Sequence, residues 1–172
     1  MPGTRPILAL GADLKNTITL VVGNQAFMSQ HLGDLANYAS LEAFGETIQD
    51  LISMYEVNWD DLLVVHDLHP EYYSTLHAVE LPVCARRAVQ HHRAHVASVL
   101  AERQAWQRRA VGVSFDGTGD ADDGTIWGGE FFTANLSDGW SRALHLRSAF
   151  LPGYDAAAKL PVQCAAGFLS QI

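Results

Sequence analysis

The sequence predicts an α/β protein built from a duplicated β-β-β-α-β-α module, with one complete module and the first strands of a second. Two observations predict this class. Apolar runs of strand length alternate with segments of helical periodicity. A group of three β-rich runs near the N-terminus is also echoed by a second group about 100 residues later, with few identical residues. Such a duplication makes a two-lobed protein with a cleft between lobes. We expect the first module at 1–107 and the truncated second module at 108–172.

Three short runs at the start predict an antiparallel meander. ILALGADL (7–14) breaks at a glycine, and NTITLVVGN (16–24) is rich in β-branched residues and ends in a turn signal. QAFMSQHLGDL (25–35) fits a third strand.

The rest of the first module alternates helices with short strands. A helix is predicted over 40–57 with Ser40 as its N-cap. Its apolar face consists of Leu41, Phe44, Ile48, Leu51, Ile52 and Tyr55. A strand at 61–68, a helix at 70–81 with proline first, a strand at 83–90 and a helix at 92–106 follow. The last helix has Val96, Val99, Leu100 and Trp106 on one face.

The second module opens in the same way as the first. Strands are predicted at 109–117, 124–136 and 141–150, joined by turns at 117–124 and 137–140. The final segment, LPVQCAAGFLSQI, is typical of the start of a helix.

Composition narrows the possible functions. The formal net charge is −8 and the sequence has no basic stripe, so we expect no nucleic-acid partner. No apolar run approaches the roughly 18 residues of a membrane span, so we expect no membrane insertion. Cys84 and Cys164 form no CxxC pair, which favours reduced thiols in a cytoplasmic protein.

The segment QHHRAH contains a possible metal site. His91 and His95 are four residues apart, so a helix places them on one face, which is the spacing that metal-binding helices use. The glutamate of the H-E-x-x-H motif is absent, because His92 stands in its place. The alternative is that His92 caps the helix and the other two are ordinary polar residues. Spacing alone leaves both interpretations open.

The segment SFDGTGDADDGTIWGGEF (114–131) predicts a functional loop. It holds five glycines and four aspartates within 14 residues (116–129), more than a turn requires. Backbone N–H groups in a D-G-T-G turn can hold a phosphate, because glycines permit close approach. Asp116, at the strand end, could bind a cation. The alternatives are a plain hairpin loop and, for Asp120, Asp122 and Asp123, a solvated acidic turn.

GADLKNT (11–17) occupies the equivalent place in the first meander. There Lys15 and Asn16 lie in a tight turn, where a lysine could pair with a phosphate or acyl oxygen. A lysine in a hairpin is more often simply solvated.

Six segments taken in order resemble the carboxy-terminal region of the HypF family, carbamoyltransferases of nickel–iron hydrogenase maturation. They are ALGADLKNT, AFMSQHLGDL, HDLHPEYYST, VQHHRAHVASVLAE, VSFDGTGDADDGTIWGGEF and LPGYDAAAKLP. The resemblance implies an actin/hexokinase-like fold, related to the TsaD family of tRNA threonylcarbamoyl transferases and to antibiotic O-carbamoyltransferases.

The resemblance also implies a reaction and a site. A YrdC-like domain makes carbamoyl-adenylate from carbamoyl phosphate and ATP, and the domain seen here transfers the carbamoyl group to the C-terminal cysteine of HypE. His91, His95 and Asp116 match the ligands of a zinc or iron ion, with a further carboxylate from the missing part of the second lobe. Under this hypothesis Lys15 and Asn16 are the catalytic residues and contact the nucleotide's phosphate or the carbamoyl group. The nucleotide contacts fall on Gly117, Thr118, Gly119, Asp123 and Gly124.

The chain departs from full-length relatives, because the YrdC-like and acylphosphatase domains, the CxxC zinc fingers and the rest of the second lobe are absent. We therefore expect a fragment or a split gene product, inactive alone. The alternatives are an O-carbamoyltransferase or threonylcarbamoyl transferase of the same fold, and a non-catalytic fragment that binds a nucleotide or a partner. DGTIWGGEF favours HypF over its fold relatives.

Overall fold

The computed structural model describes residues 5–105, 107–135, 139–153, 156–157 and 160–172. The chain divides into two compact units, Met1–His91 and His92–Ile172, and each is described by itself. The domain boundary that the sequence predicts, between residues 107 and 108, stays a prediction.

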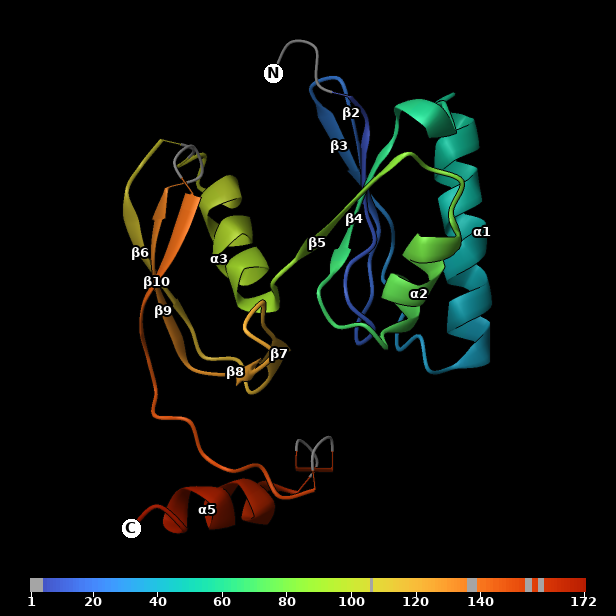
Figure 1. Cartoon of the computed structure of the whole chain (residues 1–172). Coiled ribbons are helices and arrows are strands. Elements are labelled where there is room, and N and C mark those ends of the chain that lie inside the picture. The colour runs from blue at the N-terminus through green and yellow to red at the C-terminus, as the bar shows by residue number, and fades with distance from the viewer. Residues whose placement is uncertain (1–4, 106, 136–138, 154–155, 158–159) are drawn as a thin grey trace. The chain divides into compact units, whose positions relative to one another are not determined.

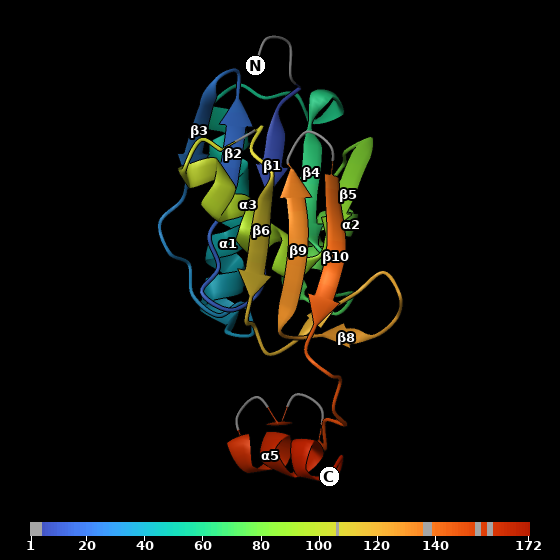
Figure 2. The ribbon, with the colours of Figure 1, turned by 90° about the vertical axis from the view of Figure 1, so that its left-hand side faces the viewer.

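The first unit (Figure 1) contains a five-stranded mixed sheet in the order β3-β2-β1-β4-β5, which can be followed in Figure 2. Its strands are β1 Ile7–Ala9, β2 Thr19–Val22, β3 Gln25–Met28, β4 Leu63–Asp67 and β5 Ala85–Val89. The first three form the predicted antiparallel meander, and β4 and β5 continue the sheet in parallel. All are shorter than the predicted runs, because the polar ends of those runs form the connecting loops.

Two helices, α1 Tyr38–Met54 and α2 Tyr73–Glu80, lie on the same side of this sheet (Figure 1). The predicted apolar face of α1 is confirmed, since Phe44, Ile48 and Ile52 are buried in the core. The predicted cap Ser40 is wrong. The side chain of Asn37 caps the helix instead by accepting the N–H of Ala39 at 3.0 Å.

Helix α2 begins three residues after the predicted Pro70. The reason is the carboxylate of Asp13, which accepts the N–H groups of Tyr73 and Ser74 at 2.9 and 3.1 Å and so satisfies the first turn. A short 3₁₀ turn, η1 Trp59–Asp61, precedes β4 and was not predicted.

The second unit repeats the meander. Strands β6 Ala110–Ser114, β9 Glu130–Asn135 and β10 Gly139–His145 form an antiparallel sheet in the order β10-β9-β6 (Figure 2). Helix α3, His91–Glu102, buries Val96 and Leu100 in the same core as Phe132. Gly112 on β6 permits this packing, because a Cβ there would lie 2.4 Å from a methyl group of Val96.

The predicted strand 124–136 is two strands. A small hairpin, β7 Gly119–Asp120 with β8 Ile126–Trp127, ends before Gly128, and β9 starts at Glu130. The break falls at Gly129, whose positive φ of 75° interrupts the extended backbone. The last predicted helix is present as α5, Pro161–Leu169. Trp106 and the first two residues of the predicted turn at 137–140 lie outside the described residues, and the last two belong to β10.

The element order that the sequence predicts is thus confirmed for the first meander and for the helices that follow it, whereas the second meander contains the additional β7–β8 hairpin. Within the described ranges, no helix is both long and apolar enough to cross a membrane. Cys84 and Cys164 carry free thiols, as predicted.

Candidate metal centre

The parallel strands β4 and β5 bring two loops to one edge of the first sheet. Asp67, the last residue of β4, pairs with Val89, the last residue of β5. His91 follows Val89 by two residues and begins helix α3. Because parallel strands end at the same edge, Asp67 and His91 meet there, with 2.7 Å between Asp67 Oδ2 and His91 Nδ1.

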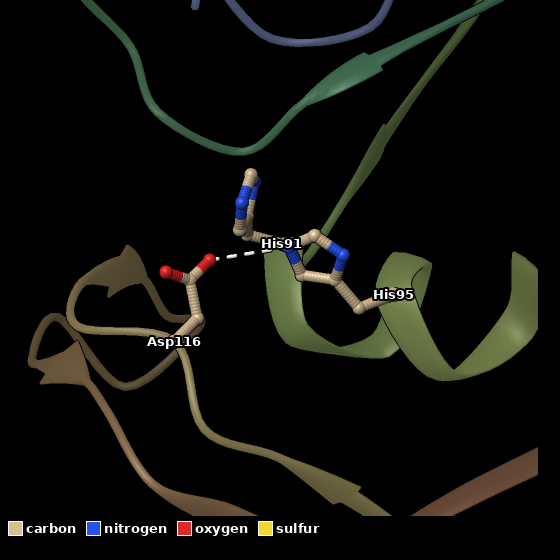
Figure 3. A group of neighbouring side chains, drawn as sticks. All are labelled: His91, His95 and Asp116. Carbon is tan, nitrogen blue, oxygen red and sulfur yellow. Dashed lines mark hydrogen bonds and ion pairs between the residues drawn. The ribbon is translucent and has the colours of Figure 1, made fainter.

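Helix α3 then carries His95 one turn beyond His91, as the spacing predicts. Asp116 lies two residues after the end of β6, and its Oδ2 is 3.1 Å from His95 Nε2. His91, His95 and Asp116 each offer one donor atom within 4.8 Å of the other two (Figure 3). Of the predicted site residues, these three are brought together as a group.

The donor set fits a first-row metal ion. Two imidazole nitrogens and a carboxylate oxygen suit zinc and iron alike. A tetrahedral ion with bonds of about 2.1 Å holds its ligand atoms roughly 3.4 Å apart, so small rotations of these side chains would close the set. His95 and Asp116 are exposed enough to admit an ion, whereas His91 is half-buried.

His92 is not a capping residue, and this interpretation of the sequence is wrong. The helix already begins at His91, so His92 points inward with Val96 and is completely buried. Its Nε2 lies 3.5 Å from the main-chain oxygen of Asp116. A buried imidazole therefore packs beneath the loop that presents the third donor. The sequence offered one indication of this burial. His92 and the apolar Val96 are four residues apart, so a helix places them on one face.

The loop after β6 is shaped by a close backbone approach. Asp116 Oδ1 accepts the N–H of Gly117 at 2.8 Å, which orients the carboxylate. A Cβ added at Gly128 would lie 2.6 Å from the main-chain oxygen of Gly117. Only a glycine at 128 allows the two segments to lie this close. Gly117 and Thr118 are exposed, and Gly119 begins β7, so the predicted phosphate contacts at 117–119 have accessible backbone at two of three positions.

Asp123 and Gly124 shape the β7–β8 hairpin. The Asp123 carboxylate accepts the N–H and hydroxyl of Thr125 at 3.0 and 2.6 Å, and the indole N–H of Trp127 at 3.2 Å. The hydrogen bond from the Thr125 hydroxyl is the main reason that the pKa of Asp123 is lowered. Gly124 has a positive φ of 74°. Their predicted contact with a nucleotide stays a prediction.

An ion pair that was not predicted from the sequence supports the loop after β6. Glu130 is completely buried and accepts two hydrogen bonds from Arg142, at 2.6 and 2.8 Å, and one from Gly128 N–H at 3.2 Å. The Arg142 guanidinium also lies 4.1 Å from the centre of the Trp127 ring. Burial alone would raise the pKa of Glu130, but the hydrogen bonds and charge of Arg142 lower it. Glu130 and the buried Phe132 are two residues apart on β9, so they face the same side of the sheet. This spacing was the available sequence signal, but the prediction of one continuous strand at 124–136 obscured it.

Lys15 and Asn16 lie in the loop after β1. Lys15 is exposed and has a positive φ of 51°. Asn16 is buried and its Nδ2 donates to the main-chain oxygens of Leu10 and Ala12, at 2.8 and 2.6 Å. Neither belongs to the group of three metal donors. The predicted catalytic role of both residues stays a prediction.

Two family models match the chain in succession. The model described as the HypF Kae1-like domain matches residues 2–102. The model described as the second subdomain of the carbamoyltransferase Kae1-like domain matches residues 112–172. This chain belongs to the HypF family.

Curated HypF relatives are much longer than this chain. Carbamoyltransferase HypF2 of Cupriavidus necator is 46% identical over 168 residues, which cover 95% of this chain and 20% of the relative. Carbamoyltransferase HypF of Synechocystis is 40% identical over 170 residues, which cover 98% and 21%. The chain therefore spans about a fifth of the length of these HypF proteins.

Solved HypF structures share the fold. A structure of full-length HypF in the phosphate- and nucleotide-bound form matches with a TM-score of 0.86 and 36% identity, over 95% of this chain and 21% of that one. HypF of T. kodakarensis matches with a TM-score of 0.86 and 33% identity, over 100% and 23%. The predicted HypF resemblance and the predicted α/β, actin/hexokinase-like fold class are both confirmed.

Proposed function

We propose that this chain is the part of a HypF-type carbamoyltransferase that binds a metal ion and carbamoyl-adenylate. The proposal rests on one observation: His91, His95 and Asp116 offer three metal donors within 4.8 Å of one another, in a chain of the HypF family. Two further facts support it. The curated relatives are named carbamoyltransferases, and one solved HypF holds phosphate and nucleotide. These names also favour carbamoyl transfer of the HypF type over the other transferases of this fold.

Each residue has a proposed role. His91, His95 and Asp116 would hold a zinc or iron ion, which when bound would supply Lewis acidity for the acyl group. The loop of residues 117–119 contacts the nucleotide's phosphate, and its Gly117 N–H, which donates to Asp116 in this structure, would have to change partner to do so. Lys15 supplies a positive charge for a phosphate or carbamoyl oxygen. Asn16 holds the loop that carries Lys15, through its bonds to Leu10 and Ala12. Asp123 and Gly124 set the shape of the neighbouring hairpin.

The proposed reaction is an acyl transfer. The sulfur of the acceptor's C-terminal cysteine attacks the carbamoyl carbon and forms a C–S bond. The bond from that carbon to the phosphate oxygen breaks, AMP leaves with the electron pair, and the thiol proton passes to solvent. The acceptor is a HypE-like protein. A YrdC-like domain supplies the carbamoyl-adenylate, and the rest of the second lobe supplies a further carboxylate ligand and excludes water. We place this reaction in the cytoplasm.

Metal and nucleotide titrations test the proposal. The wild-type chain should bind one Zn²⁺ in calorimetric titration, and the double variant His91→Ala, His95→Ala should lose that binding, because two of three donors are removed. His31→Ala, which removes an exposed histidine outside the group, is the matched control and should bind as the wild type does. Equal zinc binding by wild type and double variant would refute the metal site.

A second titration tests the nucleotide. ATP or carbamoyl-adenylate should bind more tightly to the zinc-loaded wild-type chain than to the double variant. Absence of nucleotide binding with and without metal would overturn the catalytic interpretation.

A further inference from the structure

The buried carboxylate of Asp67 lies at the end of β4, beside the first proposed metal ligand. Only 7% of its side chain is exposed. Oδ1 accepts the N–H of His69 at 2.9 Å, and Oδ2 lies 2.7 Å from Nδ1 of His91. The main-chain oxygen of Asp67 also accepts the Thr75 hydroxyl at 3.2 Å. Both carboxylate oxygens and the backbone of this residue are therefore held in place.

These contacts determine which nitrogen of His91 carries a proton. An ionised carboxylate only accepts hydrogen bonds, so Nδ1 of His91 must be the donor at 2.7 Å. In the neutral ring the other nitrogen, Nε2, then carries the lone pair that a metal ion requires. The same contact restricts rotation of the ring about its own axis.

We propose that Asp67 is a positioning residue for the metal centre: it fixes the tautomer and the orientation of His91 so that Nε2 serves as the metal donor. The inference rests on the proposed metal site. Metal-bound histidines commonly donate their second N–H to a carboxylate, and such a partner raises the basicity of the ligand nitrogen. The motif HDLHP thereby gains a role that spacing alone did not suggest, because the parallel register of β4 and β5 brings it to His91.

Asp67→Asn is the sharpest test, because asparagine keeps the size of the side chain but has only one acceptor. The fixed N–H of His69 requires that acceptor, so the NH₂ group would face Nδ1 of His91. The ring would then carry its proton on Nε2, which blocks the metal donor. We expect Zn²⁺ affinity, measured by competition with a chromophoric chelator, to fall roughly 10- to 100-fold. In long-range ¹⁵N–¹H spectra of the metal-free protein, His91 should change from the Nδ1–H to the Nε2–H tautomer.

Two control variants separate positioning from general damage. Thr75→Val removes the hydrogen bond to the Asp67 backbone and leaves the carboxylate, so it should lower stability without changing zinc affinity or the tautomer. Asp50→Asn removes an exposed charge on α1 and should change neither the zinc affinity nor the tautomer of His91.

The outcomes separate this inference from the proposed function. A wild-type chain that binds no zinc overturns the metal site and with it the role of Asp67. A wild-type chain that binds zinc, together with an Asp67→Asn variant of equal affinity and unchanged tautomer, overturns the role of Asp67 alone. Equal losses of zinc affinity in Asp67→Asn and Thr75→Val, with an unchanged tautomer, would also overturn it.

Discussion

The loop after β1 and the loop after β6 occupy equivalent places in the two meanders but are held in opposite ways. The first loop is held from within, because the buried amide of Asn16 bonds to the main-chain oxygens of Leu10 and Ala12. The second loop is held from outside, by the approach of Gly128 and by the buried pair of Glu130 and Arg142. The amide N–H groups of Asn16 donate within their own loop, whereas Asp116, in the second loop, also reaches His95. Equivalent loops of the two meanders are therefore stabilised by different kinds of contact.

The largest effect should come from removing the external support. Glu130→Ala leaves the Arg142 guanidinium without its two short hydrogen bonds and opens space under Gly128. Breaking a buried pair costs roughly 3–5 kcal/mol, and because Arg142 is partly exposed we expect about 3 kcal/mol. Urea denaturation followed by tryptophan fluorescence measures this loss. A change below about 1 kcal/mol would show that the pair does not support the second unit.

Gly128→Ala tests the close approach itself. The added Cβ would lie 2.6 Å from the Gly117 oxygen, so the backbone must move, at a cost of about 2 kcal/mol. We also expect weaker zinc binding, because Gly117 is bonded to Asp116. Gly117→Ala is the matched stability control, since a Cβ there meets no atom within 4 Å. Equal stability of the two variants in urea would contradict the role of the approach.

Asn16→Ala tests the loop that is held from within. Loss of the Asn16 amide leaves the main-chain oxygens of Leu10 and Ala12 without their side-chain donor. We expect the free energy of unfolding to fall by about 1.5 kcal/mol. Asn16→Asp should be no better, because an ionised carboxylate cannot donate to a carbonyl. Hydrogen–deuterium exchange should rise at residues 10–17, while zinc affinity stays unchanged. Reduced zinc affinity in Asn16→Ala would show that the first loop also supports the metal site.

The sequence was sufficient where the periodicity of one segment decides the structure. The strands of both meanders and the face of α1 that holds Phe44 follow from local patterns, and the spacing of His91 and His95 survives in α3. The missed features depend on partners from elsewhere in the chain. Burial of His92 requires the packing of α3 on its sheet, and the bond between Asp67 and His91 requires the register of two parallel strands. The start of α2 was misjudged for the same reason, since a carboxylate 60 residues away accepts the N–H of its first residue.

The smallest predicted effect is a difference between the two units in how their stability depends on pH. Burial lowers the pKa of His77 in the first unit below its ordinary 6.5, although Glu80 partly opposes this. Nε2 of His77 is buried and has no hydrogen-bond partner among the described residues, so the folded state favours the neutral ring. The unfolded chain then binds the proton more readily. The contribution of His77 to the stability of the folded state is therefore present above pH 6.5. It is lost as the pH falls from 6.5 towards the lowered pKa of the folded state.

Glu130 in the second unit behaves differently, because its pKa is lowered in the folded state. Its contribution to stability therefore persists until the pH falls below 4.5, the ordinary pKa of a glutamate. Peptides of α1 and α2 should consequently lose protection from hydrogen–deuterium exchange at a higher pH than peptides of β9 and β10. His77→Gln should remove the loss near pH 6.5 in the first unit and leave the acid response of the second unit unchanged. The same pH response with and without the histidine would mean that His77 is not the group that titrates.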